Sequence, residues 1–290
     1  MLSKMREQAP FSDFFFFVVD RHTANFWLQK INPLWSIHQA LGKVVKKEEA
    51  AHDMVSLTIQ INRHFQMGQA GQHHPVYVDV QGIRYERTYS LTQLDAQHVL
   101  LSVKKVDQGK VSHWLCEQTQ IGDILEFGQP YGDMKLTVND PELILLAAGS
   151  GITPMLSLLK RLDHTTQLKT QPVHLMYWVK QHADAAFKPY FEQLAPQYPR
   201  FQISNLDTKE QNTDQRLNAD HLTGLTQIYQ ATVYACGPSG FVATVDALFG
   251  EAKILKTEAF SMSQFTNDEV GFVNITLTKS NKILSIPKGQ

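Results

Sequence analysis

The run from Leu143 to Ala148 leads into a glycine turn and then an apolar helix, a combination that can hold a phosphate. Its uninterrupted apolar residues are typical of a parallel strand covered on both faces. Gly149 and Gly151 permit a tight turn and let a ligand approach bare backbone. Thr153 and Pro154 predict an N-cap and a first helical residue, and free N–H groups at a helix start attract a pyrophosphate. Alone, such a turn is a weak signal, because many glycine turns only change the chain direction.

Two further motifs flank this turn. Arg87-Thr-Tyr-Ser90 lies in the strand-like run Ile83–Leu91, and a later strand runs into Cys236-Gly-Pro238. In this order the three motifs resemble the ferredoxin–NADP(H) reductase superfamily. Those flavin-dependent reductases carry an R-x-Y-S flavin motif, a G-x-G-I-T-P turn and a C-G-P motif. The resemblance covers residues 40 to 260 of the chain, and the ordered set is far more specific than any one motif.

The resemblance implies that Arg87, Thr88, Tyr89 and Ser90 contact a flavin. Arg87 offers a fixed fork of donors for phosphates. Tyr89 offers a flat face and a hydroxyl to the ribityl and ring region, and Ser90 a hydroxyl or N–H at the flavin N5. Without the other motifs, the same residues would predict an ordinary strand with a solvated arginine and a core tyrosine.

A second element concerns the identity of the flavin. Gly109-Lys-Val-Ser112 leads into the only obvious helix of the β-rich region, Val111 to Gln118, and resembles the G-x-V-S element of FAD-binding members. Gly109, Val111 and Ser112 are therefore expected to hold a pyrophosphate at a helix start. FMN has no second phosphate, so the element favours FAD.

The resemblance also assigns the nucleotide side of the site. Thr153 is expected near the nicotinamide, and Cys236 beside its C4 atom, where open α/β sheets bind ligands. We expect Cys236 to act through polarisable packing and not as a nucleophile; a merely buried strand-end cysteine is the alternative. Ser90, Thr153 and Cys236 are thus the residues expected at the reacting centre. The other expected nucleotide contacts are Gly149, Gly151, Ile152, Pro154, Gly237 and Pro238.

The choice of donor depends on the end of the second nucleotide-domain strand. An acidic residue there would pair with the ribose 2′-hydroxyl of NADH. None occurs before Asp184, and Lys180 can instead meet a 2′-phosphate. The sequence therefore favours NADPH, with NADH as the alternative. Lys180 could also be an ordinary solvated charge in a loop. By resemblance, Phe260 in the segment Glu258-Ala-Phe260 covers the isoalloxazine ring.

The chain divides into four expected segments. Residues 1–40 form an N-terminal extension that is helical in part. Short alternating strands between glycines over residues 41–138 predict an antiparallel β-barrel, the FAD-binding domain. Strand–helix alternation over residues 139–257 predicts an α/β domain with a parallel sheet, the NAD(P)-binding domain. Residues 258–290 form a linker and a β-hairpin.

The expected hairpin, Val270 to Ile286, turns near Ser280 and Asn281. In several relatives a plant-type ferredoxin domain follows at this place and opens with a similar hairpin. Such a domain needs four cysteines for its [2Fe–2S] cluster, and none follows Cys236. A truncated ferredoxin-like domain is the favoured interpretation, so the cluster is expected only if a missing C-terminal domain exists.

The composition sets the remaining expectations. With 43% hydrophobic residues and a net charge of −1, the chain has no basic excess for nucleic acid. Two cysteines exclude a disulfide framework, suit a reducing cytoplasm, and together with the histidine spacing indicate no metal site. The apolar run Phe14–Val19 is too short to span a bilayer. It is expected to pack on the protein itself, or alternatively to contact the inner face of a membrane or a partner.

Together these features predict a two-domain NAD(P)H-dependent flavoprotein reductase that passes single electrons to a one-electron acceptor protein. The N-terminal extension, with Pro33-Leu-Trp-Ser36, resembles reductases that serve membrane fatty-acid desaturases. A ferredoxin, a desaturase or an oxygenase component is therefore the expected partner. The rival from another class is a non-catalytic flavin- or nucleotide-binding regulatory module.

Overall fold

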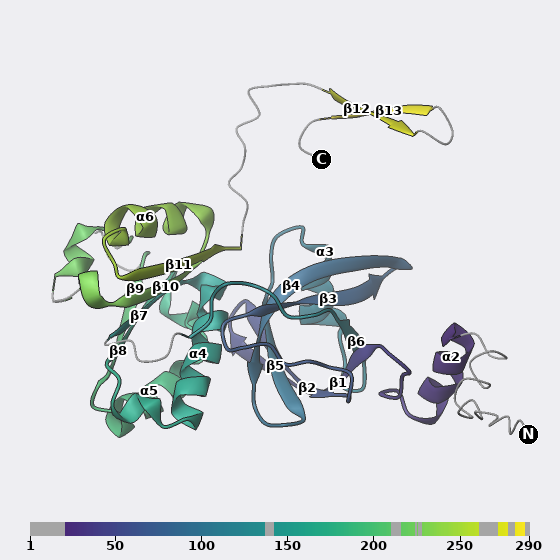
Figure 1. The fold of residues 1–290 in the computed structure, drawn as a ribbon, viewed down its shortest axis with the longest axis horizontal. Helices are drawn as coiled ribbons and strands as arrows, with labels where there is room; N and C mark the ends of the chain where they lie inside the picture. Colours follow the sequence, from purple (N-terminus) through teal and green to yellow (C-terminus); the bar gives the residue numbers. More distant parts are fainter. Residues whose placement is uncertain are drawn as a thin grey trace, which may run out of the picture.

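The structure is a computed structural model. It describes residues 21–136, 142–209, 216–223, 225 and 228–260, together with the backbone of the strands at 272–277 and 282–287. Within these residues lie a barrel, a parallel sheet with its helices, an N-terminal helix and a two-stranded hairpin (Figure 1).

Six antiparallel strands close into a barrel in the order β1-β2-β5-β4-β3-β6. Alternating apolar residues point inward, so Val44, Leu57 and Leu101 are fully buried in its core. The strands are β1 (Ala40–Ala51), β2 (Met54–Ile61), β3 (His73–Val80), β4 (Ile83–Gln93), β5 (His98–Lys104) and β6 (Ile124–Phe127). This is the antiparallel barrel that the sequence predicts.

The predicted helix of the barrel region is present, in two parts. α3 (Lys110–His113) continues into a π-helical turn, η1 (Trp114–Gln118). Val111 and Leu115 project from it into the barrel core. Their burial fixes the loop after β5, including Gly109, against the barrel.

The second domain contains a five-stranded parallel sheet in the order β11-β10-β7-β8-β9. The chain enters at the central strand β7, builds outward on one side, and then crosses to the other. This reversal puts a topological switch point beside β7 and β10, at whose carboxyl ends open α/β sheets bind ligands. The strands are β7 (Leu143–Ala148), β8 (Val173–Val179), β9 (Phe201–Asp207), β10 (Thr232–Gly237) and β11 (Ile254–Ala259).

Helices cover both faces of this sheet, which explains why β7 is apolar throughout. Leu143 and Leu145 pack with α4 (Ile152–His164) and α5 (Lys188–Gln197) on one face. Ile144 and Leu146 pack with α6 (Ser239–Phe249) on the other. α4 lies on the side of the sheet that faces the barrel (Figure 1).

Three local expectations need correction. Thr153 is not an N-cap, because α4 already begins at Ile152 after the 3₁₀ turn η2 (Gly149–Gly151). The predicted helix Ala185–Leu194 instead runs as α5 from Lys188, after the short turn η4 (His182–Asp184). β11 was not expected as a strand.

The N-terminal extension contains α2 (Arg21–Ile31), so it is helical in part as expected. The hairpin is also present as β12 (Phe272–Leu277) and β13 (Lys282–Pro287), which pair antiparallel. Its turn at Ser280 and Asn281, the run Phe14–Val19 and the boundary near residue 138 lie outside the described residues. Among the helices that are described, none combines the length and apolar character needed to span a bilayer.

Candidate functional site

A cavity of about 590 Å³ lies between the barrel and the switch point of the sheet. Its volume falls in the range of small-molecule and cofactor pockets. The barrel supplies β4 and the loop before α3, and the α/β domain supplies the ends of β10 and β11 and the start of α4. Eleven of the predicted site residues line it: Arg87, Thr88, Tyr89, Ser90, Gly109, Val111, Ser112, Thr153, Pro154, Cys236 and Phe260.

The β4 segment presents its motif along one wall. Arg87 is exposed, and its Nη1 donates to the carbonyl of Glu86 at 2.7 Å, which leaves most of the guanidinium fork toward solvent. Tyr89 packs partly against the barrel core, and this burial raises the pKa of its hydroxyl, so the phenol stays protonated. Ser90 lies opposite His73 in the β3–β4 register.

The loop before α3 is held by the side chain that was expected to bind a phosphate. Ser112 Oγ donates to the carbonyl of Gly109 at 3.0 Å and accepts from the N–H of Val106 at 3.1 Å. A Cβ at Gly109 would lie 2.5 Å from this Oγ atom. The Ser112 hydroxyl therefore shapes the turn, and backbone N–H groups are left as the donors that the turn can offer.

The nucleotide turn depends on two glycines for different reasons. Gly149 has a φ of +56°, in the left-handed region that favours glycine. A Cβ at Gly151 would lie 1.9 Å from the carbonyl oxygen of Cys236, so only glycine permits this close approach of α4 to β10. The Thr153 hydroxyl donates to the carbonyl of Ser150 at 3.1 Å, which braces the turn from inside.

Cys236 is 6% exposed at the end of β10 and borders the cavity. Burial, and secondarily the carboxylate of Glu258, raises the pKa of its thiol well above the ordinary value. A thiol that stays protonated is a poor nucleophile, so this geometry agrees with a packing role.

Several predicted nucleotide residues lie beside the cavity without lining it. Gly149, Gly151 and Ile152 form the turn and the helix start behind Ser150 and Thr153, both of which do line it. Gly237 and Pro238 follow Cys236. Lys180 is exposed and follows the carboxyl end of β8. It lies at the same edge of the sheet as Cys236 but farther from the cavity.

Nine of the residues that line this cavity were not among the predicted site residues, and His73, Lys104, Tyr131 and Glu258 are four of them. His73 begins β3, and its Nδ1 lies 3.5 Å from Glu258 Oε2 on β11.

Lys104 ends β5 and contributes a positive charge to the cavity. Its Nζ lies 2.8 Å from Asp53 Oδ2, which belongs to the turn between β1 and β2. The same Nζ would be 3.9 Å from a Cβ at Gly149. The barrel thus places an ammonium group beside the nucleotide turn of the other domain.

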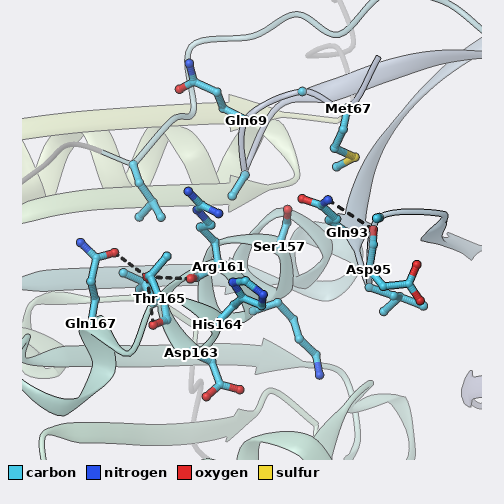
Figure 2. Close-up of a pocket in the computed structure, with 17 residues that line it drawn as sticks. Met67, Gln69, Gln93, Asp95, Ser157, Arg161, Asp163, His164, Thr165 and Gln167 are labelled. Atoms are coloured by element: carbon cyan, nitrogen blue, oxygen red, sulfur yellow. Dashed lines mark hydrogen bonds between the residues drawn. The ribbon is translucent and has the colours of Figure 1, made fainter. Parts of the chain in front are cut away.

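A second and larger cavity, of about 1060 Å³, opens elsewhere along the domain interface (Figure 2). It contains none of the predicted site residues. Within the part of the chain that the structure describes, His, Cys, Asp and Glu side chains form no group of three that could hold a metal ion.

Comparisons with known proteins agree with this geometry. Residues 41–136 match the oxidoreductase FAD-binding domain family, and residues 145–247 match the oxidoreductase NAD-binding domain family. An NADPH oxidoreductase of Mycobacterium tuberculosis is 30% identical over 273 residues, which cover 88% of this chain and 69% of that protein. The chain belongs to the ferredoxin–NADP(H) reductase superfamily.

Other relatives of the reductase are longer. A flavohemoprotein of Pseudomonas putida is 29% identical over 212 residues, which cover 70% of this chain but 53% of that protein. The chain thus spans about half the length of the flavohemoproteins it matches.

Solved structures share the fold. The flavohem-like FAD/NAD-binding domain of nitric oxide dioxygenase from Vibrio cholerae superposes with a TM-score of 0.68 at 23% identity, covering 77% of this chain and 99% of that one. Phthalate dioxygenase reductase superposes with a TM-score of 0.65 at 24% identity, covering 87% and 77%. At these identities the likeness establishes the fold alone.

The reductase is an NAD(P)H-dependent flavoprotein oxidoreductase with FAD and a nicotinamide dinucleotide as its cofactors. The residues present fit both. Arg87, Lys104 and Lys110 bring positive charge to a cavity that must take anionic phosphates, while Tyr89 and Phe260 supply aromatic surface. When bound at this cavity, the flavin would supply hydride and electron-transfer chemistry that the side chains themselves lack.

Proposed function

We propose that this reductase takes its hydride from NADPH and passes single electrons to an iron–sulfur protein or another one-electron acceptor. The observation that carries the proposal is the shared cavity. Ser90 of the barrel and Thr153 and Cys236 of the α/β domain border one space at the domain boundary. Hydride transfer needs two rings held close and aligned more than it needs acid–base groups.

Within this cavity we assign roles by position. Ser90 would offer its hydroxyl or N–H to the flavin N5 atom, and Arg87 would bind phosphate oxygens. Cys236 and Thr153 would border the nicotinamide. Phe260, 51% exposed at the cavity edge, would cover the flavin ring and give way to the nicotinamide.

The preference for NADPH rests on basic side chains at the carboxyl edge of the sheet. Lys180 follows β8, and Lys188 Nζ contacts His182 Nε2 just beyond it. Asp207, at the end of β9, lies 3.7 Å from His182 Nδ1 and partly offsets this charge. Glu192 Oε1 also lies 3.6 Å from Lys188 Nζ, so Lys180 is the cation that supports a 2′-phosphate site, and Lys180→Glu would shift the preference toward NADH.

The descriptions of two structural neighbours support a one-electron acceptor. Phthalate dioxygenase reductase is described as a modular structure for electron transfer from pyridine nucleotides to [2Fe–2S], and another structural neighbour is a cytochrome P450 reductase. We propose the same kind of one-electron acceptor for this reductase. We also propose that the enzyme it serves is a fatty-acid desaturase or an oxygenase.

The deciding experiment is an anaerobic visible spectrum of the purified protein with FAD, before and after addition of NADPH and then NADH. Bleaching of the flavin by NADPH at lower concentrations than NADH supports the proposal. A bound flavin that neither nucleotide bleaches would instead indicate the regulatory module. Reduction of an added [2Fe–2S] ferredoxin, followed by a lipid-desaturation assay with a desaturase, then tests the acceptor class.

Exposed apolar side chains of α2 and of the segment that follows it support contact of the N-terminal region with a membrane. Trp27 is 63% exposed, Ile31 72% and Trp35 49%. Aromatic residues beside a lysine suit the lipid–water interface, and Lys30 lies on the same helix. Co-sedimentation with anionic phospholipid vesicles should fall for Trp27→Ser but not for Tyr229→Ser, an equally exposed aromatic in the α/β domain. Equal binding by both variants would count against the contact.

A further inference from the structure

α4 is the element that joins the two halves of the site. It begins at the nucleotide turn and runs along the barrel, where its later turns border the larger cavity (Figure 2). Figure 2 shows Ser157 on this helix, with Gln69 and Met67 above it and Gln93 of β4 to its right.

The Ser157 hydroxyl bonds two barrel segments at once. It donates to the carbonyl of Leu91 at 3.1 Å and accepts from the N–H of Gly71 at 3.4 Å. Ser157 is 4% exposed, so these bonds are shielded from water. Leu91 directly follows Ser90, and Gly71 lies two residues before His73. One hydroxyl therefore ties the helix to β4 and to the turn before β3, whose facing residues Ser90 and His73 line the cavity of about 590 Å³, called the flavin cavity below.

The turn that donates its N–H to Ser157 requires a glycine. Gly71 has a φ of +92°, and a Cβ there would lie 2.2 Å from the carbonyl oxygen of Met134 and 3.0 Å from Leu158 Cδ2. At its start, α4 is fixed by the contact of Gly151 with the Cys236 carbonyl. The start of the helix is thus anchored to β10 at Gly151, and the helix is anchored to the barrel at Ser157, nearly two turns later.

We propose that Ser157 is a positioning residue that sets the separation between the nucleotide turn and the β3–β4 wall of the flavin cavity. An α-helix rises about 1.5 Å per residue, so Ser157 lies roughly 6 Å along the axis from Thr153. Because the helix is rigid, holding Ser157 against the barrel also fixes the position of Thr153 relative to the barrel. Without the hydroxyl, the Leu91 carbonyl and the Gly71 N–H lose a buried partner, and α4 shifts to let water reach them.

This proposal rests on the proposed hydride transfer, because the separation matters only if two rings must meet in the cavity. Small displacements of reacting groups slow such steps strongly, by as much as about a hundredfold for about 1 Å. We therefore expect Ser157→Ala to slow flavin reduction at saturating NADPH by about tenfold. The dissociation constant of NADP⁺ and the FAD content should stay close to those of the wild type.

The experiment combines stopped-flow reduction with two measurements that do not depend on turnover. Hydrogen–deuterium exchange of the peptide containing Gly71 should accelerate in Ser157→Ala. The visible difference spectrum induced by NADP⁺ should change shape, because it reports how the rings stack. The primary isotope effect with NADPH deuterated at C4 should rise as hydride transfer becomes more limiting. Ser157→Cys keeps the size of the side chain with a weaker hydrogen-bonding group, and it should show the same slow reduction.

The matched control is Thr119→Val. Thr119 is 1% exposed, its hydroxyl donates to the Trp114 carbonyl at 3.3 Å, and it lines neither cavity. Its loss should lower the melting temperature without changing the reduction rate. The positioning role is overturned if the Ser157 variants reduce flavin as fast as the wild type, or if the control slows it equally. If NADPH does not bleach the wild-type flavin, the proposed function fails instead.

Discussion

Nδ1 of His73 lies 3.5 Å from Oε2 of Glu258, so a barrel strand and the edge strand of the α/β sheet meet beside the flavin cavity. Both side chains are mostly buried, at 19% and 23% exposed. Tyr131 stands edge-on to the imidazole with ring centroids 4.3 Å apart. The pair is one of several polar contacts that bridge the domains, and it is the one that borders the space where the nicotinamide is expected.

Glu258→Gln should weaken binding of oxidised nucleotide more than binding of reduced nucleotide. The oxidised nicotinamide ring is cationic, and a carboxylate beside Cys236 favours it over the neutral reduced ring. A partly exposed charge pair contributes at most about 1 kcal/mol, so a shift of roughly fivefold in the ratio of dissociation constants is expected. Difference-spectral titrations with NADP⁺ and with tetrahydro-NADP, which cannot donate a hydride, measure that ratio.

Glu126→Gln is the matched control for this prediction. Glu126 pairs with Arg84 at 2.8 Å, is 25% exposed and does not border the cavity. Its substitution removes the same charge from a barrel strand, β6, without touching the site. An unchanged ratio in Glu258→Gln would show that this carboxylate does not sense the nicotinamide charge.

Asp53 should compete with the nucleotide for Lys104. The Lys104 ammonium lies 2.8 Å from Asp53 while it borders the nucleotide turn, and an incoming phosphate would have to share or displace that partner. Asp53→Asn should therefore tighten NADP⁺ binding about threefold, and Lys104→Ala should weaken it about fivefold, in line with energies of partly exposed charge pairs near 1 kcal/mol. Titrations at two ionic strengths provide the check, since both effects must shrink as salt increases. Tighter binding in Lys104→Ala would contradict the competition.

Much of the architecture follows from local patterns. β2 alternates Met54-Val-Ser-Leu-Thr-Ile-Gln-Ile61, with its apolar positions largely facing the core, as a barrel strand requires. β7 is apolar at every position because helices cover both faces of the sheet. β11 was missed because Ile254-Leu-Lys-Thr-Glu-Ala259 is a half-buried edge strand whose polar residues resemble a linker. The N-cap at Thr153 was wrong because the Gly149–Gly151 turn already curls the backbone into the helix.

The missed site residues share a different cause. His73, Lys104 and Glu258 lie on three strands far apart in the sequence, so no local spacing connects them. Only the register of β3 on β4, which sets His73 opposite Ser90, brings the histidine to the cavity. Pairings over such separations depend on how the whole barrel closes, and a single sequence contains no direct signal for them.

Gly151→Ala should abolish nucleotide binding. The added Cβ would meet the Cys236 carbonyl oxygen at 1.9 Å, so either α4 or the end of β10 must move. Overpacking of this kind typically costs about 1–3 kcal/mol of unfolding free energy, and here it displaces the turn itself. Flavin absorbance should persist because the barrel is unaffected, whereas NADP⁺ should no longer perturb it.

Gly240→Ala serves as its control. A Cβ there meets no atom within 4 Å, and the residue lies in the first turn of α6 at the same end of the sheet. Alanine also favours a helix over glycine by up to about 1 kcal/mol. This variant should bind nucleotide normally and melt at an equal or higher temperature. Normal binding in both variants would refute the steric role of Gly151.

His74 should make the stability of the barrel fall in mild acid. It is 1% exposed and stacks on Phe65, with Nδ1 3.4 Å from the Gly128 carbonyl and Nε2 3.4 Å from the N–H of Gly68. These contacts suit a neutral ring that donates from Nδ1 and accepts at Nε2. Burial, with a smaller effect of His73, lowers the pKa of His74 to about 4, below the 6.5 of an exposed histidine.

Because the pKa is lower in the folded state, the unfolded chain binds the proton first. The contribution of neutral His74 is complete above pH 6.5 and is lost as the pH falls toward 4, by roughly 3 kcal/mol in total. Urea unfolding at pH 7.5, 6 and 5 measures this slope. His74→Gln, which cannot be protonated, should be less stable at pH 7.5 but show a flatter dependence, while His164→Gln at an exposed site should retain the wild-type slope. Equal slopes in all three proteins would show that another group causes the acid sensitivity.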